Sequence, residues 1–139
     1  MIDLARIDSS AIVEGAWLDV EVPPQLQDGT PFRIKLASTY SEVFRVAAAE
    51  YRRTLAKLKR SHDDGSNEAE ETNAELQAAL TLDWTGLVNG GQPWPCTKAN
   101  AKELYLKQAW IRDQVVQFTA VSANFIQALP SPDPTRPES

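Results

Sequence analysis

The stretch LTLDWTGLVNGGQPWPCTKANAKELYLKQAWIRDQVV, residues 80–116, holds three of the four tryptophans in the 139-residue sequence. Its middle, NGGQPWP, is rich in glycine and proline, which interrupt regular structure and reverse the chain. After this turn Thr97 can cap a helix, because its hydroxyl can accept a hydrogen bond from a free amide of the first turn. A catalytic cleft, a binding face and a structural clasp could each place tryptophans here. We expect the clasp, in which the turn covers the start of the last helix, to be formed by Trp84, Gly86, Trp94 and Trp110.

Apolar residues recur at alternating steps of four and three after this turn, the spacing of one face of a helix. The recurring positions are Ile111, Val115, Phe118, Ser122, Phe125 and Leu129. Packing in the core explains most of this stripe, although a seam for self-association stays open. Few other apolar residues remain to cover its C-terminal end. We therefore expect contacts with a partner at Asn124, Phe125, Ile126 and Leu129.

Two segments near the N-terminus alternate apolar with polar residues, the pattern of half-buried strands. They are residues 16–22 (AWLDVEV) and residues 30–36 (TPFRIKL). The loop between them contains two prolines and the turn pair Asp28-Gly29, so the pattern predicts a β-hairpin. An isolated hairpin is only marginally stable in water, and helices are therefore needed to cover its apolar face.

Two helices are expected between this hairpin and the tryptophan-rich turn. The first starts near Thr39, because the spacing of three residues from Thr39 to Glu42 is that of a capping box. Its outer face is basic over residues 45–60. A run of acidic residues follows and predicts an exposed, mobile loop near residues 62–70. Residues 70–82 then give a shorter second helix.

The expected fold is an α+β domain that is mainly α, with the N-terminal β-hairpin packed on three to four helices. Residues 1–129 form a single domain, because a chain of this length can bury about 68% of its unfolded surface. Residues 130–139, PSPDPTRPES, contain four prolines and no large apolar side chain. This composition predicts a disordered tail.

No constellation of residues predicts catalysis, a cofactor or a metal ion. The single histidine, His62, lies beside Asp63 and Asp64, but catalysis would also need a positioned nucleophile and a metal ion would need further ligands. Cys96 is the only cysteine, so no intramolecular disulfide can form, which fits a reducing cytoplasm. The glycine pair at residues 90–91 lacks the lysine of a phosphate-binding loop. We therefore expect a protein that is not an enzyme.

The net charge of the chain indicates which classes of partner it can bind. The 14 basic and 19 acidic residues give a net charge of −5, which argues against a general nucleic-acid binder, because such affinity rests on neutralising phosphates. The basic face of residues 45–60 could still contact nucleic acid, although solvated charge or pairing with the neighbouring acidic run is the stronger interpretation. The first residues lack the apolar run of a signal peptide, and no stretch approaches the ~18 apolar residues of a membrane helix.

A series of short motifs resembles the tail assembly chaperones of long-tailed, siphophage-type bacteriophages. Each motif is short and tolerant, and their order and spacing together carry the resemblance. They are Asp83-Trp84-Thr85-Gly86, Gly90-Gly91, Pro93-Trp94-Pro95, Thr97 with Asn100, Ala109-Trp110-Ile111-Arg112, and Ala123-Asn124-Phe125. The front half is also similar, with IVEGAWLDVEV, a second strand and a helix containing YRRTLAKLKR, so the resemblance covers residues 7–129. Trp94 and Cys96 depart from the pattern, which carries smaller or different residues at this proline step.

The resemblance implies a non-enzymatic assembly factor in the host bacterial cytoplasm. Such chaperones bind the tape measure protein, keep its long helices soluble, recruit tail tube subunits, and are absent from the finished virion. Two other classes stay open. One is a small nucleic-acid-binding regulator that uses the basic helix at residues 45–60, and the other is a minor virion or connector component.

Overall fold

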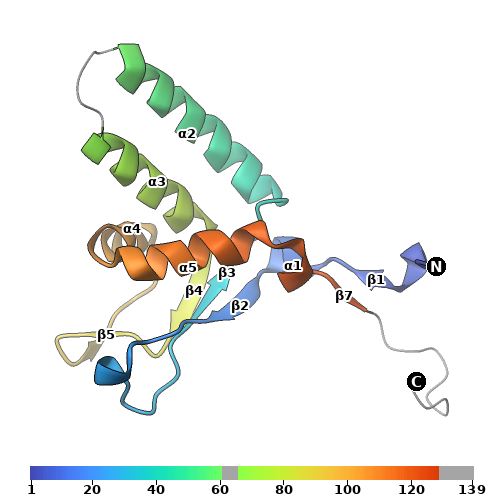
Figure 1. The fold of residues 1–139 in the computed structure, drawn as a ribbon, viewed down its shortest axis with the longest axis horizontal. Coiled ribbons are helices and arrows are strands. Elements are labelled where there is room, and N and C mark those ends of the chain that lie inside the picture. Colours follow the sequence, from blue (N-terminus) through green and yellow to red (C-terminus); the bar gives the residue numbers. More distant parts are fainter. Residues whose placement is uncertain (61–65, 129–139) are drawn as a thin grey trace.

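The computed structural model describes residues 1–60 and 66–128, and its architecture is a mixed α+β fold in which helices dominate (Figure 1). The α-helices are α1 (Ala11–Glu14), α2 (Glu42–Arg60), α3 (Ser66–Leu80), α4 (Lys98–Lys107) and α5 (Ala109–Ala120). The 3-10 turns are η1 (Leu4–Arg6), η2 (Pro24–Leu26) and η3 (Ser122–Asn124). The strands are β1 (Ile7–Asp8), β2 (Ala16–Asp19), β3 (Arg33–Leu36), β4 (Thr81–Thr85), β5 (Val88–Asn89), β6 (Gln92–Pro93) and β7 (Gln127–Ala128).

A three-stranded antiparallel sheet in the order β2-β3-β4 lies behind and below α5 in Figure 1. The predicted N-terminal hairpin is confirmed, because β2 pairs with β3 and places Leu18 opposite Ile34. Alternation sets this register, since a slip of one residue would turn Ile34 from the core to the other face. The loop that joins the two strands contains η2 and then Gly29, whose φ of 86° suits a turn.

The sequence predicts a helix through residue 82, and this is wrong at its end. The α3 helix stops at Leu80, and β4 pairs with β3 so that Trp84 lies opposite Ile34. The Leu80 carbonyl accepts a hydrogen bond from the Ala37 amide at 2.9 Å, directly after β3 ends. Pairing along β3 fills the open edge of the hairpin. This long-range gain outweighs a short helical pattern that has little local support.

One face of the sheet packs on α3, α4 and α5 to form the core. Ile34 of β3 is fully buried, and the small side chains of Ala74 and Ala78 let α3 and α4 lie close together. Tyr105 of α4 is also fully buried, and its hydroxyl lies 2.6 Å from the Thr81 hydroxyl. Burial raises the pKa of Tyr105 far above its usual range, so this side chain is a neutral hydrogen-bonding partner in the core.

The α2 helix projects away from the core with α3 beside it (Figure 1). Its cap is Ser41 rather than the predicted Thr39, because the Ser41 hydroxyl accepts a hydrogen bond from the Phe44 amide at 3.2 Å. The Thr39 hydroxyl instead donates to the Thr119 carbonyl at 3.0 Å, which ties the start of α2 to α5. A tertiary contact has thus replaced the local capping box.

The α3 helix begins at Ser66, so the loop predicted near residues 62–70 is wrong from residue 66 onward, and residues 61–65 lie outside the described part of the chain. Among the described side chains, the acids of α3 form ion pairs with α4 and α5. The ion pairs are Lys102 with Glu71 at 3.0 Å and Glu75 at 3.6 Å, and Arg112 with Glu70 at 3.1 Å. No ion pair between described side chains joins these acids to α2.

The apolar stripe that begins at Ile111 does not run along one continuous helix to residue 129. The α4 and α5 helices meet at Gln108, whose φ of −120° and ψ of 74° are not helical, and they point in different directions (Figure 1). The α5 helix ends at Ala120, and the chain then passes through η3 to β7. Within α5 the core role of the stripe is confirmed, because Ile111 and Val115 are buried and Phe118 packs partly buried against the core. Thr119, which lies outside the predicted stripe, is buried as well.

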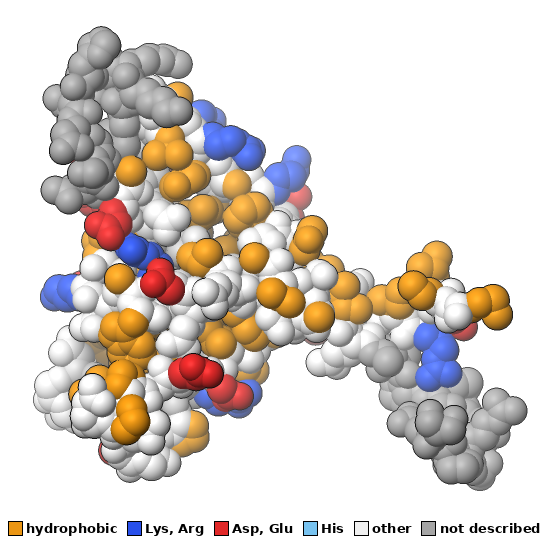
Figure 2. Space-filling model, viewed as in Figure 1, with side chains coloured by type: hydrophobic (Ala, Val, Ile, Leu, Met, Phe, Trp, Pro, Cys, Tyr) orange, Lys and Arg blue, Asp and Glu red, His pale blue; other side chains and the backbone are white. Residues whose placement is uncertain are grey.

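The two ends of the described chain meet in a two-stranded ribbon, in which Ile7 of β1 lies opposite Ala128 of β7. This ribbon extends away from the body, and hydrophobic side chains run along it (Figures 1 and 2). The predicted disordered tail at residues 130–139 falls outside the described residues. Within the described ranges, no helix has both the length and the apolar character needed to cross a membrane.

Candidate functional site: an apolar cleft

Two of the three tryptophans from the turn form a stacked pair. Trp84, in β4, is 6% exposed, and its ring lies 5.6 Å from the ring of Trp94 at an interplanar angle of 25°. The Trp84 indole N–H donates a hydrogen bond to the Trp94 carbonyl at 2.7 Å. Stacking and this hydrogen bond together fix the turn against the sheet. Of the four residues expected to form the clasp, the structure stacks Trp84 and Trp94 against each other.

Gly86 occupies a position that no other residue can fill without movement of the backbone. Its φ is 79°, and a Cβ built on it would lie 2.0 Å from the Pro31 carbonyl oxygen. The segment after β4 therefore passes directly against the loop that precedes β3. This close approach holds two walls of the site together.

The other side of the turn is held by the start of α4. The Thr97 hydroxyl accepts a hydrogen bond from the Asn100 amide at 3.1 Å, which confirms the predicted cap. The Asn100 side chain also donates to the Pro95 carbonyl at 2.9 Å. In addition, the Trp94 amide donates to the Leu87 carbonyl at 3.3 Å. The residues of the proline step are thus fixed at both ends.

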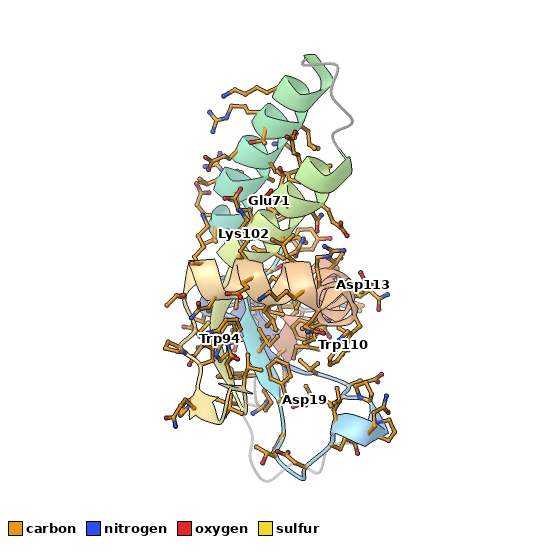
Figure 3. The ribbon with its side chains drawn as sticks, turned by 90° about the vertical axis from the view of Figure 1, so that its left-hand side faces the viewer. Asp19, Glu71, Trp94, Lys102, Trp110 and Asp113 are labelled. Carbon is orange, nitrogen blue, oxygen red and sulfur yellow. The ribbon has the colours of Figure 1, made fainter. Side chains whose placement is uncertain are left out.

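Trp110 does not join the stacked pair. Its indole N–H donates to the Gln108 side-chain oxygen at 2.9 Å, and its ring is half-buried against the core. Figure 3 shows Trp94 and Trp110 apart from each other below α4, Trp94 toward the left and Trp110 toward the right of the view. The predicted clasp therefore divides into the Trp84–Trp94 pair and a separate Trp110.

A cleft of about 950 Å³ has both Trp94 and Trp110 in its lining. The lining comes from three parts of the chain: the loop between β2 and β3, the segment after β4, and the junction of α4 with α5. Its main apolar members are Val22, Leu26, Leu87, Val88, Trp94 and Trp110. Binding sites for ligands usually measure about 300–1,000 Å³ and are mostly apolar, so this cleft is large enough to hold several side chains of a partner.

One wall of the cleft is tied to α5 by a paired hydrogen bond. The Glu21 amide donates to the Gln114 side-chain oxygen at 2.8 Å, and the Gln114 side-chain nitrogen donates to the Glu21 carbonyl at 3.1 Å. The Gln114 side chain thus hydrogen-bonds to both backbone groups of Glu21, as a neighbouring strand would. This holds the loop open beside α5 without filling the cleft.

The charged groups at the cleft are mostly acidic. Glu103 pairs with Lys107 at 2.6 Å, so these two charges offset each other. Glu21 and Asp28 also line the cleft, and neither carboxylate forms an ion pair with any of the described residues. The cleft therefore combines an apolar lining with two uncompensated negative charges.

The residues expected to contact a partner near the C-terminal end of the stripe differ in their surroundings. Phe125 is fully buried and meets the Phe118 ring edge-on at 5.4 Å, so it belongs to the core and is not available as a surface contact. The Asn124 side chain donates to the Phe118 carbonyl at 3.0 Å, while Ile126 is 39% exposed. Leu129 lies outside the described residues. Phe125 is buried because η3 folds the chain back after α5.

Cys96 lies next to the cleft in a half-buried position. Burial, followed by the charge of Asp83, raises the pKa of the Cys96 thiol to about 11. A thiol with this pKa is protonated at neutral pH and is a poor nucleophile. Among residues 1–60 and 66–128, no group of three or more His, Cys, Asp or Glu side chains is placed to hold a metal ion.

The cleft itself was missed by sequence reasoning, because its walls come from distant segments. Glu21 and Gln114, for example, are 93 positions apart and still form two hydrogen bonds. One local signal was present in the hairpin loop. The stretch VPPQL, at residues 22–26, is unusually apolar for a surface loop, and in the structure it lines one side of the cleft.

The fold and cleft together define a small α+β protein with an apolar cleft between its hairpin loop, the turn after β4 and the α4–α5 junction. Residues 39–129, more than half of the chain, match the family described as YdaY prophage protein. The chain therefore belongs to the YdaY prophage protein family and is a phage-derived protein. Comparison with curated proteins finds no match, and comparison with solved structures finds none either.

Proposed function

We propose that this protein is a tail assembly chaperone, which binds the tape measure protein and helps recruit tail tube subunits in the host cytoplasm during tail morphogenesis. Membership of a prophage protein family supports a role in the life of a phage. The ordered series of motifs that resembles tail assembly chaperones supports this more specific role. On this proposal the protein leaves the tail before the virion is complete.

One observation carries the proposal: the motifs behind the resemblance build the cleft. Trp84 stacks on Trp94, Gly86 makes the close approach to Pro31, and Asn100 fixes the proline step. These residues hold a shape and do not converge on a reacting group. A chaperone for long apolar helices needs such a surface, because an amphipathic helix binds by laying its apolar face into a groove.

Co-expression with the tape measure protein of the same prophage tests the proposal. We expect the tape measure protein to be insoluble alone, because its helices expose apolar stripes, and soluble when this chain is present. The two proteins should also co-purify. Equal insolubility with and without this chain would reject the chaperone role. Finding this chain in purified virions would favour a minor virion or connector component instead.

A second candidate, a nucleic-acid-binding regulator, has one observation in its favour. Arg52, Arg53 and Lys57 of α2 are exposed and form no ion pair with any described residue. A basic helix face of this kind can neutralise phosphates. Salt-dependent binding to duplex DNA that is lost on reversing these three charges would support the regulator. We expect no such binding from a protein with a net charge of −5.

A further inference from the structure

We propose that the cleft binds one class of partner segment: an amphipathic helix whose apolar face is flanked by basic residues. This inference rests on the proposed function and deepens it, because it assigns the site and the charge of the segment that a tape measure protein would present. The support comes from the lining of the cleft, its rigidity and its charge.

The apolar lining has the form of a trough with exposed side chains on its walls. Val88 is 60% exposed and Leu26 is 61% exposed, while Leu104 and Ile111 are buried and belong to the core beneath. Figure 2 shows hydrophobic side chains gathered over the lower left of the molecule, where Figure 1 places β5 and η2. A helix can place side chains three and four positions apart into such a trough.

The trough is preformed rather than assembled by a partner. Gln114 holds the loop after β2, the Trp84–Trp94 stack holds the segment after β4, and the close approach of Gly86 to Pro31 joins the two walls. A site that is already ordered loses little conformational entropy on binding. The lining therefore acts as a fixed template.

Trp94 supplies a polar anchor within this apolar lining. Its carbonyl and amide are engaged, but its indole N–H donates to no group in the described part of the chain. Half-buried tryptophans with a free donor are typical of binding hot spots. The N–H of Trp94 is available to a side-chain or carbonyl oxygen of the partner segment.

Charge decides which helix fits. The lining contains the acids Glu21, Asp28 and Glu103 and the single base Lys107, and the Glu103–Lys107 pair leaves two negative charges uncompensated. Basic residues beside the apolar face of the partner would meet these carboxylates, whereas acidic ones would be repelled. The apolar N-terminal arm of a second copy is a poorer match, because Asp3 and Asp8 offset its amino terminus and Arg6.

Two matched peptides test this inference on the full chain. Both are fluorescein-labelled amphipathic helices of about 15 residues with the same leucine face, and their polar face carries lysine in one peptide and glutamate in the other. Fluorescence anisotropy measures their dissociation constants. We expect the lysine peptide to bind more tightly, and its advantage to shrink as salt rises.

Substitutions then assign the site. Val88→Lys places a positive charge in the trough and should abolish binding of the lysine peptide. Val46→Lys is the control, because Val46 is 59% exposed on α2, nearly the same as Val88, but lies outside the cleft. The double variant Glu21→Gln and Asp28→Asn should weaken the lysine peptide by about three- to ten-fold, as expected for two exposed charge pairs. The amide at position 28 preserves the hydrogen bond that Asp28 accepts from the Thr30 amide at 2.9 Å.

Each outcome decides between the occupants. Tighter binding of the glutamate peptide, or equal loss in both valine variants, would overturn the inference. So would a self-association of this chain that Val88→Lys abolishes while neither peptide binds, because the occupant would then be a second copy. If Val88→Lys still co-purifies with the tape measure protein, the chaperone function stands and the cleft assignment fails. If the lysine peptide binds as expected but the tape measure protein does not, the cleft assignment stands and the proposed function fails.

Discussion

Replacing Trp84 tests whether the stacked tryptophan pair is structural. Trp84 is 6% exposed, and truncating a buried tryptophan to alanine costs about 3–5 kcal/mol through lost burial and the cavity that remains. For a chain of this size, 1 kcal/mol corresponds to about 3–5 °C in the melting temperature. Trp84→Ala should therefore lower the melting temperature by roughly 10–20 °C. Thermal unfolding followed by far-UV circular dichroism measures this directly.

Trp84→Phe separates the stack from the hydrogen bond. Phenylalanine keeps an aromatic ring beside Trp94 but cannot donate to the Trp94 carbonyl, so it should cost only about 1–2 kcal/mol. Trp17→Ala is a second control, because Trp17 is half-buried in β2 and lies outside the core cluster, where its ring meets the Arg33 guanidinium at 5.3 Å. A Trp84→Ala variant that melts within about 2 °C of the parent, yet no longer binds the tape measure protein, would refute a structural role.

Three further changes have clear expected outcomes. In chemical denaturation, Gly86→Ala should destabilise the protein by about 1–3 kcal/mol more than Gly29→Ala. Both glycines have positive φ, but only at Gly86 would an added Cβ meet a backbone oxygen. Equal effects of the two substitutions would contradict this steric explanation. Phe125→Ala should lower the free energy of unfolding by about 3–5 kcal/mol, because Phe125 is fully buried. Ile126 is 39% exposed, so Ile126→Ala should leave the melting temperature nearly unchanged. It should weaken partner binding if this end of the chain contacts a partner. At pH 8, Cys96 should react with iodoacetamide roughly 100-fold more slowly than a thiol with the ordinary pKa of 9.0, because burial raises its pKa to about 11 and so lowers the fraction of thiolate. The reaction rate should recover when the protein is unfolded in denaturant. Equal rates in the folded and unfolded protein would show that Cys96 is not buried.

Local patterns were sufficient to predict the hairpin and the cap of α4. In residues 16–22 and 30–36 the alternation has a period of two and a turn pair lies between, and both signals point to the same pairing. Thr97 follows two prolines and precedes a helical run, so its role as a cap depends only on neighbours in the sequence. The structure confirms both predictions.

Long-range contacts decided the elements that the sequence did not predict. The segment that became β4 continues the pattern of α3, and only its pairing with β3 changes its structure at Leu80. No glycine or proline marks the break at Gln108, where α4 and α5 separate. Thr39 is drawn from capping α2 to a hydrogen bond with Thr119, 80 residues away. For β4 and for Thr39, a partner remote in the sequence supplies the deciding interaction.

The candidate site shows the same division. The sequence identified Trp84, Gly86 and Trp94 as residues that shape the turn, because their types and spacing are unusual. It did not show that Trp110 stands apart from the stacked pair, or that the hairpin loop forms the facing wall. The place of Trp110 depends on the turn between α4 and α5 at Gln108, and the place of the hairpin loop depends on the hydrogen bonds between Glu21 and Gln114, which are 93 positions apart.

Hydrogen–deuterium exchange of this chain, free and bound to the tape measure protein, shows which surface receives the partner. We expect protection of amides in the segments that line the cleft: residues 20–32, residues 86–94 and the junction of α4 with α5. Amides on the outer face of α2 should exchange at the same rate in both states. Protection confined to α2 or to the terminal ribbon, or no complex at all, would contradict the claim that this cleft receives a tape measure helix.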